Sequence, residues 1–129
     1  MKRVALLFLS LVLLVALSSP AWGTRTVKIP SRVTIASKGM VMHGHVRSPN
    51  PGCIEGRKVK LKIDSSGGND QVIGTDTTNA HGRWRIQVSG FAGVSLAHFY
   101  ARVRRQSQGT AGTIYVCRPD RSRTIMLGG

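Results

Sequence analysis

Acidic residues are scarce in this chain. It has 5 Asp and Glu against 19 Lys and Arg, which gives a formal net charge of +14 at pH 7. Paired carboxylates for general acid–base catalysis would have to come from these few acids, of which Asp64 and Asp76 are expected in turns. Serines are plentiful, but none stands in a Gly-x-Ser-x-Gly nucleophile elbow. We therefore expect no catalytic residues and no enzymatic activity.

Potential metal ligands are also few. The chain has 4 His and 2 Cys. His43 and His45 share one face of an expected strand, but a zinc site normally needs three or four protein ligands and no carboxylate cluster accompanies this pair. We therefore expect neither a metal site nor a cofactor. A cavity that brought His43, His45 and an acid together would instead point to catalytic chemistry.

Long apolar runs are missing except at the start of the chain. A short basic segment at residues 1–3 precedes an almost continuously apolar run at residues 4–17, and the small residues Ala21 and Gly23 follow. These are the parts of a secretory signal peptide, which we assign to residues 1–23. The alternative is a retained membrane anchor, although the run is shorter than the roughly 20 residues that span a bilayer.

The absence of a second apolar run predicts no integral membrane association after signal cleavage. We expect the protein to be secreted, either extracellular or associated with the cell envelope. Its two cysteines, Cys53 and Cys117, suit an oxidising compartment, where disulfides persist. Pairing them would close a long loop and contribute roughly 4 kcal/mol in the chain-entropy model. Free thiols or an intermolecular bridge are the alternative.

Helical periodicity is also missing after residue 23. Apolar residues alternate with period two, and turn-forming residues interrupt the pattern about every eight to twelve residues, as is typical of an all-β sandwich or barrel. The clearest strand covers residues 57–63, where Val59, Leu61 and Ile63 alternate with three lysines. Strict alternation indicates one buried face and one solvated face.

Further strands are expected along most of the chain. Alternation and turn residues place them at residues 40–47, 71–75, 83–88, 97–104, 113–117 and 123–127. Residues 79–82 should form a tight turn in which Gly82 adopts a positive φ, and Trp84 should point into the core. Residues 106–112 are expected to be a flexible polar link. The predicted organisation is a signal peptide at 1–23, an N-terminal extension or leading strand at 24–39 and a β-sandwich domain at 40–129.

Three motifs follow one another: Gly-Arg-Lys-Val-Lys-Leu at residues 56–61, Gly-Thr-Asp-Thr-Thr-Asn-Ala-His-Gly-Arg-Trp at residues 74–84 and Tyr-Ala-Arg-Val at residues 100–103. One cysteine precedes the first motif and the other follows the last. This order resembles small secreted bacterial domains of prealbumin-like type (transthyretin-like or carboxypeptidase regulatory-like). The resemblance implies a seven-stranded Greek-key β-sandwich, related in shape to immunoglobulin domains, with a Cys53–Cys117 bridge. It implies little about activity, because such domains are mostly accessory.

Basic side chains are the functional lead in this sequence. Lys58, Lys60 and Lys62 share the solvated side of one expected strand, and Arg102 and Arg104 share that of another. If the prealbumin-like layout holds, those strands lie in one sheet. The face would then bind nucleic acid, teichoic acid or acidic polysaccharide through salt-sensitive contacts. A base-stacking groove is not expected, because stacking needs exposed aromatic rings among the charges.

The competing interpretation is that the charge is spread over the surface. Arg83, Arg85 and His43 should fall on the opposite sheet, and further arginines lie near the C-terminus. Charge on all sides would keep a small exported protein soluble. The sequence favours a secreted, non-enzymatic module with a structural or interaction role at the cell exterior, in contact with an envelope component. Binding of anionic polymers is the alternative.

Overall fold

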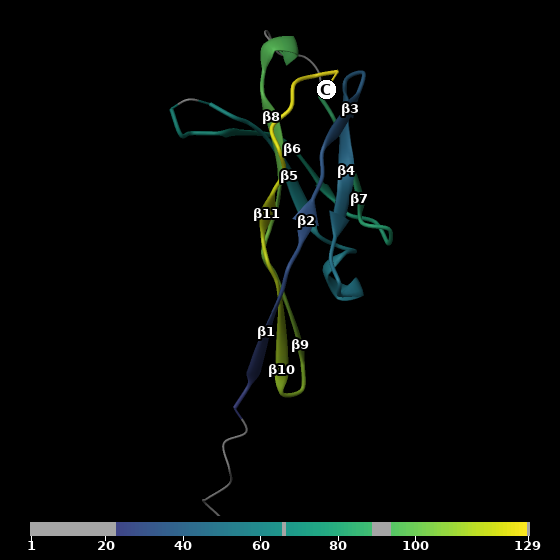
Figure 1. Ribbon diagram of the computed structural model, residues 1–129, viewed down its shortest axis with the longest axis vertical. Coiled ribbons are helices and arrows are strands. Elements are labelled where there is room, and N and C mark those ends of the chain that lie inside the picture. Colours follow the sequence, from purple (N-terminus) through teal and green to yellow (C-terminus); the bar gives the residue numbers. More distant parts are fainter. Residues whose placement is uncertain (1–22, 66, 89–93, 129) are drawn as a thin grey trace, which may run out of the picture.

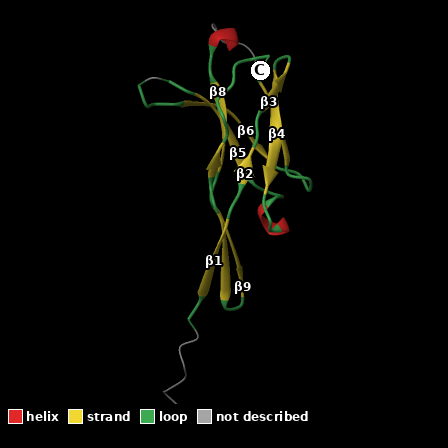
Figure 2. Cartoon of the chain, viewed as in Figure 1, coloured by secondary structure: helices red, strands yellow, loops and turns green. Residues whose placement is uncertain are grey.

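The computed structural model describes residues 23–65, 67–88 and 94–128, and β-strands dominate these residues (Figure 1, Figure 2). The strands are β1 (Arg25–Ile29), β2 (Arg32–Val33), β3 (Ala36–Lys38), β4 (Val41–Arg47), β5 (Lys58–Ile63), β6 (Gln71–Thr77), β7 (Arg83–Gln87), β8 (Phe99–Val103), β9 (Gln106–Thr110), β10 (Thr113–Cys117) and β11 (Asp120–Arg121). Two short 3-10 helices are η2 (Pro51–Cys53) and η3 (Val94–Leu96). The all-β class expected from the sequence is confirmed.

The predicted signal peptide, residues 1–23, lies outside the described residues except for Gly23. Within the described ranges, no helix is long and apolar enough to cross a membrane.

Two sheets face each other as a sandwich (Figure 1). Sheet I has the order β11-β8-β5-β6, with antiparallel neighbours throughout. In sheet II, β4 pairs antiparallel with β2, β3 and β7. The expectation that the Lys-rich strand and the Tyr-Ala-Arg-Val strand share a sheet is confirmed, because β5 and β8 are direct neighbours. The seven-stranded Greek-key arrangement stays a prediction.

The core lies between the two sheets and follows the apolar alternation of the sequence. Its buried side chains include Val59, Leu61, Phe99, Ala101 and Val103 from sheet I and Met42, Val46, Trp84 and Ile86 from sheet II. Trp84 is 2% exposed, and its indole N–H donates a 3.2 Å hydrogen bond to the Thr34 carbonyl oxygen. Gly44 lies opposite Trp84, and a Cβ there would overlap the same carbonyl. The predicted inward direction of Trp84 is confirmed.

The turn between β6 and β7 has the expected geometry. Gly82 has a φ of 74°, and its N–H donates a 2.9 Å hydrogen bond to the Asn79 carbonyl oxygen. The Asn79 side-chain oxygen accepts the backbone N–H groups of His81 and Arg83, both at 3.0 Å. This Asx-type bonding explains why a short polar segment is enough to reverse the chain.

A three-stranded ribbon projects from one end of the sandwich (Figure 1). In it β1 pairs in parallel with β10, and β10 pairs antiparallel with β9. The expectation of a flexible link at residues 106–112 is wrong, because residues 106–110 form β9. This strand is almost entirely polar, so no apolar alternation marks it, and its backbone bonds to β10 hold it in place.

Further short strands lie at the two ends of the described chain. The extension at residues 24–39 forms three short strands, β1, β2 and β3. The last strand lies earlier than expected, at β11, which pairs with β8. Residues 123–127 contribute one isolated bridge between Ile125 and Phe99. The short apolar segment therefore covers the sandwich core without extending the sheet.

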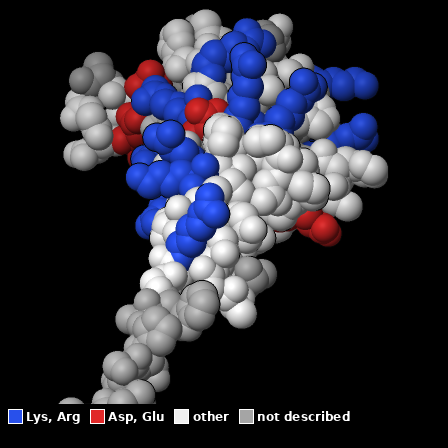
Figure 3. All heavy atoms as spheres, turned by 60° about the horizontal axis from the view of Figure 1, so that its bottom comes forward, with Lys and Arg blue, Asp and Glu red and all other residues white. Residues whose placement is uncertain are grey.

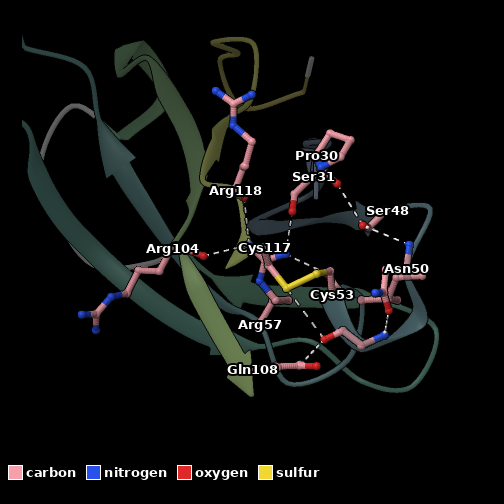
Figure 4. The surroundings of a disulfide bond; sticks show 12 residues. Pro30, Ser31, Ser48, Asn50, Cys53, Arg57, Arg104, Gln108, Cys117 and Arg118 are labelled. Carbon is pink, nitrogen blue, oxygen red and sulfur yellow. Dashed lines mark hydrogen bonds between the residues drawn. A yellow bond between two sulfur atoms is a disulfide. The ribbon is translucent and has the colours of Figure 1, made fainter. Parts of the chain in front are cut away.

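Cys53 and Cys117 form the predicted disulfide at the junction of ribbon and sandwich (Figure 4). Their Cα atoms lie 5.5 Å apart although the residues are separated by 64 positions. Both cysteines are buried, together with Ile29, in a second and smaller apolar cluster. The bridge therefore ties η2 to the end of β10.

Arg57 lies fully buried beside this disulfide (Figure 4). Its Nη1 donates hydrogen bonds to the Cys53 carbonyl oxygen at 2.8 Å and to Ser31 Oγ at 2.7 Å. Its Nη2 donates to the carbonyl oxygens of Arg104 at 2.8 Å and Arg118 at 3.1 Å. Burial lowers the pKa of the Arg57 guanidinium. The side chain joins four chain segments, and one of them is Arg104, the residue directly after β8.

Candidate anion-binding face

The outer face of sheet I brings the predicted basic residues together. Lys60 of β5 lies directly opposite Arg102 of β8, and Arg102 also lies opposite Arg121 of β11. Three cations therefore occupy one row across three neighbouring strands. Like charges directly opposite each other destabilise a sheet. Such a row indicates a surface at which an external anion would be favourable.

A shallow pocket of about 500 Å³ lies on this face. Four of the five predicted residues line it: Lys60, Lys62, Arg102 and Arg104. The fifth, Lys58, is exposed at the start of β5, before Lys60 and on the same side of the strand. Its carbonyl oxygen accepts a 3.0 Å hydrogen bond from the Arg104 N–H. The sequence prediction did not include Arg105, Ser107 and Pro119, which complete the lining. We call the five predicted residues together with Arg105 the basic face.

Three of the five acidic residues make contacts away from the basic face. Asp120 accepts the Val33 N–H at 2.8 Å, and Asp76 accepts the Arg85 N–H at 2.7 Å. Asp64 lies 3.5 Å from Arg121, which is the one salt bridge within the described ranges. No salt bridge joins a residue of the basic face to a carboxylate within the described residues.

Tyr100 closes one end of the basic face. By alternation its ring is on the outer side of β8, as expected, yet it is only 3% exposed. The Arg121 guanidinium covers the ring at 3.7 Å from its centroid, and the hydroxyl donates to the Asp70 carboxylate. The ring is therefore not available for stacking against a nucleobase.

The contact between Tyr100 and Asp70 shifts the pKa of both side chains. A hydrogen bond from the Ser65 backbone N–H, and then one from the Tyr100 hydroxyl, hold the pKa of the Asp70 carboxyl below its usual value. Burial, and then the bond to Asp70, raise the pKa of the Tyr100 hydroxyl. Asp70 therefore remains ionised beside a neutral Tyr100 at neutral pH.

The opposite sheet carries a second pocket, of about 510 Å³. His43 and His45 of β4 lie opposite Arg85 and Arg83 of β7, as the spread-charge interpretation expected. Asp76, from the edge of sheet I, also lines this pocket, so the two histidines and an acid do meet in one cavity. The remaining lining residues are Gly44, Thr77, Asn79 and Trp84.

The chemistry available in this second pocket depends on how its side chains are placed relative to one another. In the described part of the chain, no group of three or more His, Cys, Asp or Glu side chains is placed to hold a metal ion. A hydroxyl nucleophile needs a base that takes its proton. Thr77 supplies the hydroxyl on the lining, but no hydrogen bond joins it to either imidazole.

His45 has a perturbed acid–base equilibrium in this pocket. Burial lowers its pKa, and the charges of Arg83, Arg47 and His43 lower it further. The neutral imidazole is therefore favoured at neutral pH, and an anion beside it would reverse part of this effect.

Figure 3 shows Lys and Arg side chains on more than one side of the visible surface, with Asp and Glu in only a few places. The strand register places a group of cations on the outer face of sheet I and further arginines on sheet II. Sequence reasoning missed Arg121 because β11 lies before the strand expected at residues 123–127. It missed Arg105 because that residue was placed next to an expected flexible link.

No protein-family model matches this sequence, and no curated protein matches it. One solved structure, from work on the host cell surface retention of a 1.5-MDa bacterial ice-binding adhesin, aligns with 75% of this chain and 31% of its own. The sequence identity is 21% and the TM-score is 0.43. An alignment at this level assigns neither a family nor an activity to the chain.

Proposed function

We propose that this protein is an extracellular, non-enzymatic β-sandwich module that binds anionic polymers through its basic face. The observation that carries the proposal is the cross-strand pairing of Lys60 with Arg102, beside a pocket lined by four of the five predicted cations. These cations repel one another, and no salt bridge joins them to a carboxylate among the described residues. Polymer anions would relieve that repulsion and release counterions from the polymer.

Secretion and the prealbumin-like relationship suggested by the motifs are part of the same proposal. The buried Cys53–Cys117 disulfide supports export, because disulfides persist in oxidising compartments and are rare in the cytosol. A structural or interaction role at the cell exterior, in contact with an envelope component, then follows from polymer binding.

The covered Tyr100 ring bears on the kind of polymer. Proteins that bind single strands combine basic grooves with exposed aromatic rings, on which bases stack. The basic face offers cations without such a ring, so recognition would rest on phosphate, sulfate or carboxylate groups. We expect teichoic acid, sulfated polysaccharide and duplex DNA to bind, and single-stranded DNA to gain nothing from its bases.

The test is retention of the mature protein on immobilised sulfated polysaccharide, teichoic acid and duplex DNA, each eluted with a salt gradient. The informative variant is Lys60→Gln with Arg102→Gln. Its control is Lys28→Gln with Arg25→Gln, which removes the same two charge types from exposed positions on β1. The proposal expects retention above physiological salt and earlier elution of the first variant alone. Elution of the unmodified protein at low salt from all three polymers would contradict it.

A further inference from the structure

The side chains that line the second pocket indicate a more specific ligand than their positive charge alone would. Two imidazoles and two guanidiniums come from His43, His45, Arg83 and Arg85, whose strands β4 and β7 are antiparallel neighbours. Guanidinium groups recognise planar oxyanions through paired N–H donors. The pocket of about 510 Å³ lies within the usual size range of small-molecule sites, roughly 300–1,000 Å³. It is therefore larger than a bare oxyanion requires.

The remaining wall of the pocket supplies one carboxylate acceptor, Asp76, and the side-chain amide of Asn79, whose oxygen already accepts two backbone N–H groups and whose NH2 group can donate to a ligand hydroxyl. Asp76, Thr77 and Asn79 come from the end of β6 and the turn that follows it. The Asp76 carboxylate uses one oxygen, Oδ2, for the Arg85 N–H, and an ionised carboxylate has further acceptor sites. A ligand that fits this wall has hydroxyl donors at one end and an anionic group at the other.

The depression also continues along β4. A neighbouring pocket of about 420 Å³ shares His43 and Arg85 with the second pocket and is completed by Lys38 and Val41. Residues 41–45 of an extended strand cover roughly 13 Å. The combined surface therefore has room for more than one unit of a chain-like ligand, with a further cation at its far end.

We propose that the second pocket is a binding site for acidic sugar units, in which Arg83, Arg85 and the two histidines bind a carboxylate and Asp76 with Asn79 binds sugar hydroxyls. This site is separate from the basic face and lies on the other sheet, so its existence does not depend on polymer binding there. If both sites are occupied, one molecule bridges two anionic chains.

Acid should strengthen this binding. A carboxylate beside His45 favours the protonated imidazole, so binding takes up protons as the pH falls toward the pKa of this residue. The groups that face His45 are Arg83 on β7 and Arg47 and His43 on β4, and their positive charge opposes its protonation until the anion binds. The other charged groups around this sheet are Arg85 on β7, Asp76 on β6, Lys38 on β3 and Arg32 on β2, opposite Arg47.

The experiment is an NMR titration of the mature protein with a short galacturonate oligomer, followed through the imidazole resonances. The chain has four histidines, and His81 and His98 are exposed outside the pocket, so they are internal controls. We expect saturable shifts at His43 and His45 only, with about tenfold tighter binding at pH 5.5 than at pH 7.5 (roughly 1.4 kcal/mol). Equal shifts at all four histidines, or none, would overturn the proposal.

Two further ligands separate recognition of the sugar from recognition of charge. A neutral galactose oligomer should bind more weakly because it lacks the carboxylate, and inorganic phosphate should bind more weakly because it lacks the sugar hydroxyls. Phosphate binding as tightly as the uronate would contradict the assigned role of Asp76 and Asn79. Tight binding of the neutral sugar would contradict the role of the arginines.

Variants then locate the site. Arg85→Gln should weaken uronate binding on the order of tenfold, the loss expected for one charge-assisted contact. Asp76→Asn keeps an acceptor for the Arg85 N–H and should also weaken binding, with the circular dichroism spectrum unchanged. Lys60→Gln with Arg102→Gln should leave it unchanged. A loss with this last variant alone would assign uronate to the basic face and refute a second site.

Discussion

The Nη1 atom of Arg57 donates a 2.8 Å hydrogen bond to the carbonyl oxygen of Cys53, so a buried cation and a disulfide hold the same loop (Figure 4). Arg57 has no carboxylate partner among the described residues. Four neutral oxygen acceptors surround its Nη atoms, and its Nε is the one buried side-chain polar atom there without a hydrogen-bond partner. The planar guanidinium fits this arrangement because its donors point in fixed directions.

Replacing Arg57 by methionine should destabilise the protein by about 3 kcal/mol or more. The substitution fills similar volume but leaves three carbonyl oxygens without their donor in a buried site. Arg57→Lys should recover little, because an ammonium group cannot reach acceptors on both sides of the fork. Urea denaturation followed by tryptophan fluorescence measures both. A loss below about 1 kcal/mol for methionine would show that the acceptors find other partners.

The disulfide and Arg57 should be energetically coupled. Cys53→Ala with Cys117→Ala should cost roughly 4 kcal/mol, since the bridge closes a long loop. Once η2 is no longer tied to β10, the carbonyl of residue 53 is less well placed to accept from Arg57. The added cost of Arg57→Met should then be smaller than in the disulfide-bonded protein. A double-mutant cycle measures this difference, and strict additivity would contradict it.

Trp84→Ala should destabilise the protein by about 3–5 kcal/mol, because it empties the largest buried site between the two sheets. The matched control is Arg85→Ala, at the next position on the same strand, where the side chain is exposed. That control should change the free energy of unfolding by less than about 1 kcal/mol. Similar effects of the two substitutions would contradict the assigned facing of β7.

His45 should make the fold less stable in mild acid. Its pKa is lowered in the folded protein, so the unfolded chain binds the proton more readily. The contribution of neutral His45 to the free energy of unfolding is therefore complete above the unfolded pKa of about 6.5. It declines as the pH falls below that value. His45→Gln should reduce this decline between pH 7.5 and pH 5, measured by thermal unfolding in chloride buffers. An unchanged pH profile would show that His45 is not responsible.

Some of this architecture could be predicted from local sequence patterns. The alternation around Val59, Leu61 and Ile63 indicated which side of β5 is buried, and Arg57, one position before β5, has the same spacing from Val59 as Leu61 has. The burial of Arg57 was nevertheless missed, because arginine is rarely buried without a charged partner. The acceptors that satisfy it come from segments distant in sequence, and no local pattern identifies them.

In the candidate site, too, local sequence patterns predicted which side of a strand a residue occupies, but not the contacts between distant segments. The alternation of inward and outward side chains along each strand assigned Lys60 and Arg102 to one face. Their direct pairing depends only on the register of β5 with β8. Tyr100 was assigned correctly to the outer side, but its burial under Arg121 depends on β11, whose two residues have no apolar alternation. The meeting of Asp76 with the two histidines depends on contact between the edges of different sheets, which periodicity does not report.

The central claim is that the basic face binds polymer anions through specific cations. The most direct test is the salt dependence of binding to a duplex DNA of fixed length, as the slope of log affinity against log salt. Each phosphate contact contributes about 0.9 to the magnitude of this slope. Lys60→Gln with Arg102→Gln should therefore lower it by about 2, while Lys28→Gln with Arg25→Gln leaves it unchanged. Equal slopes for both variants would contradict the claim, because binding would then depend on net charge alone.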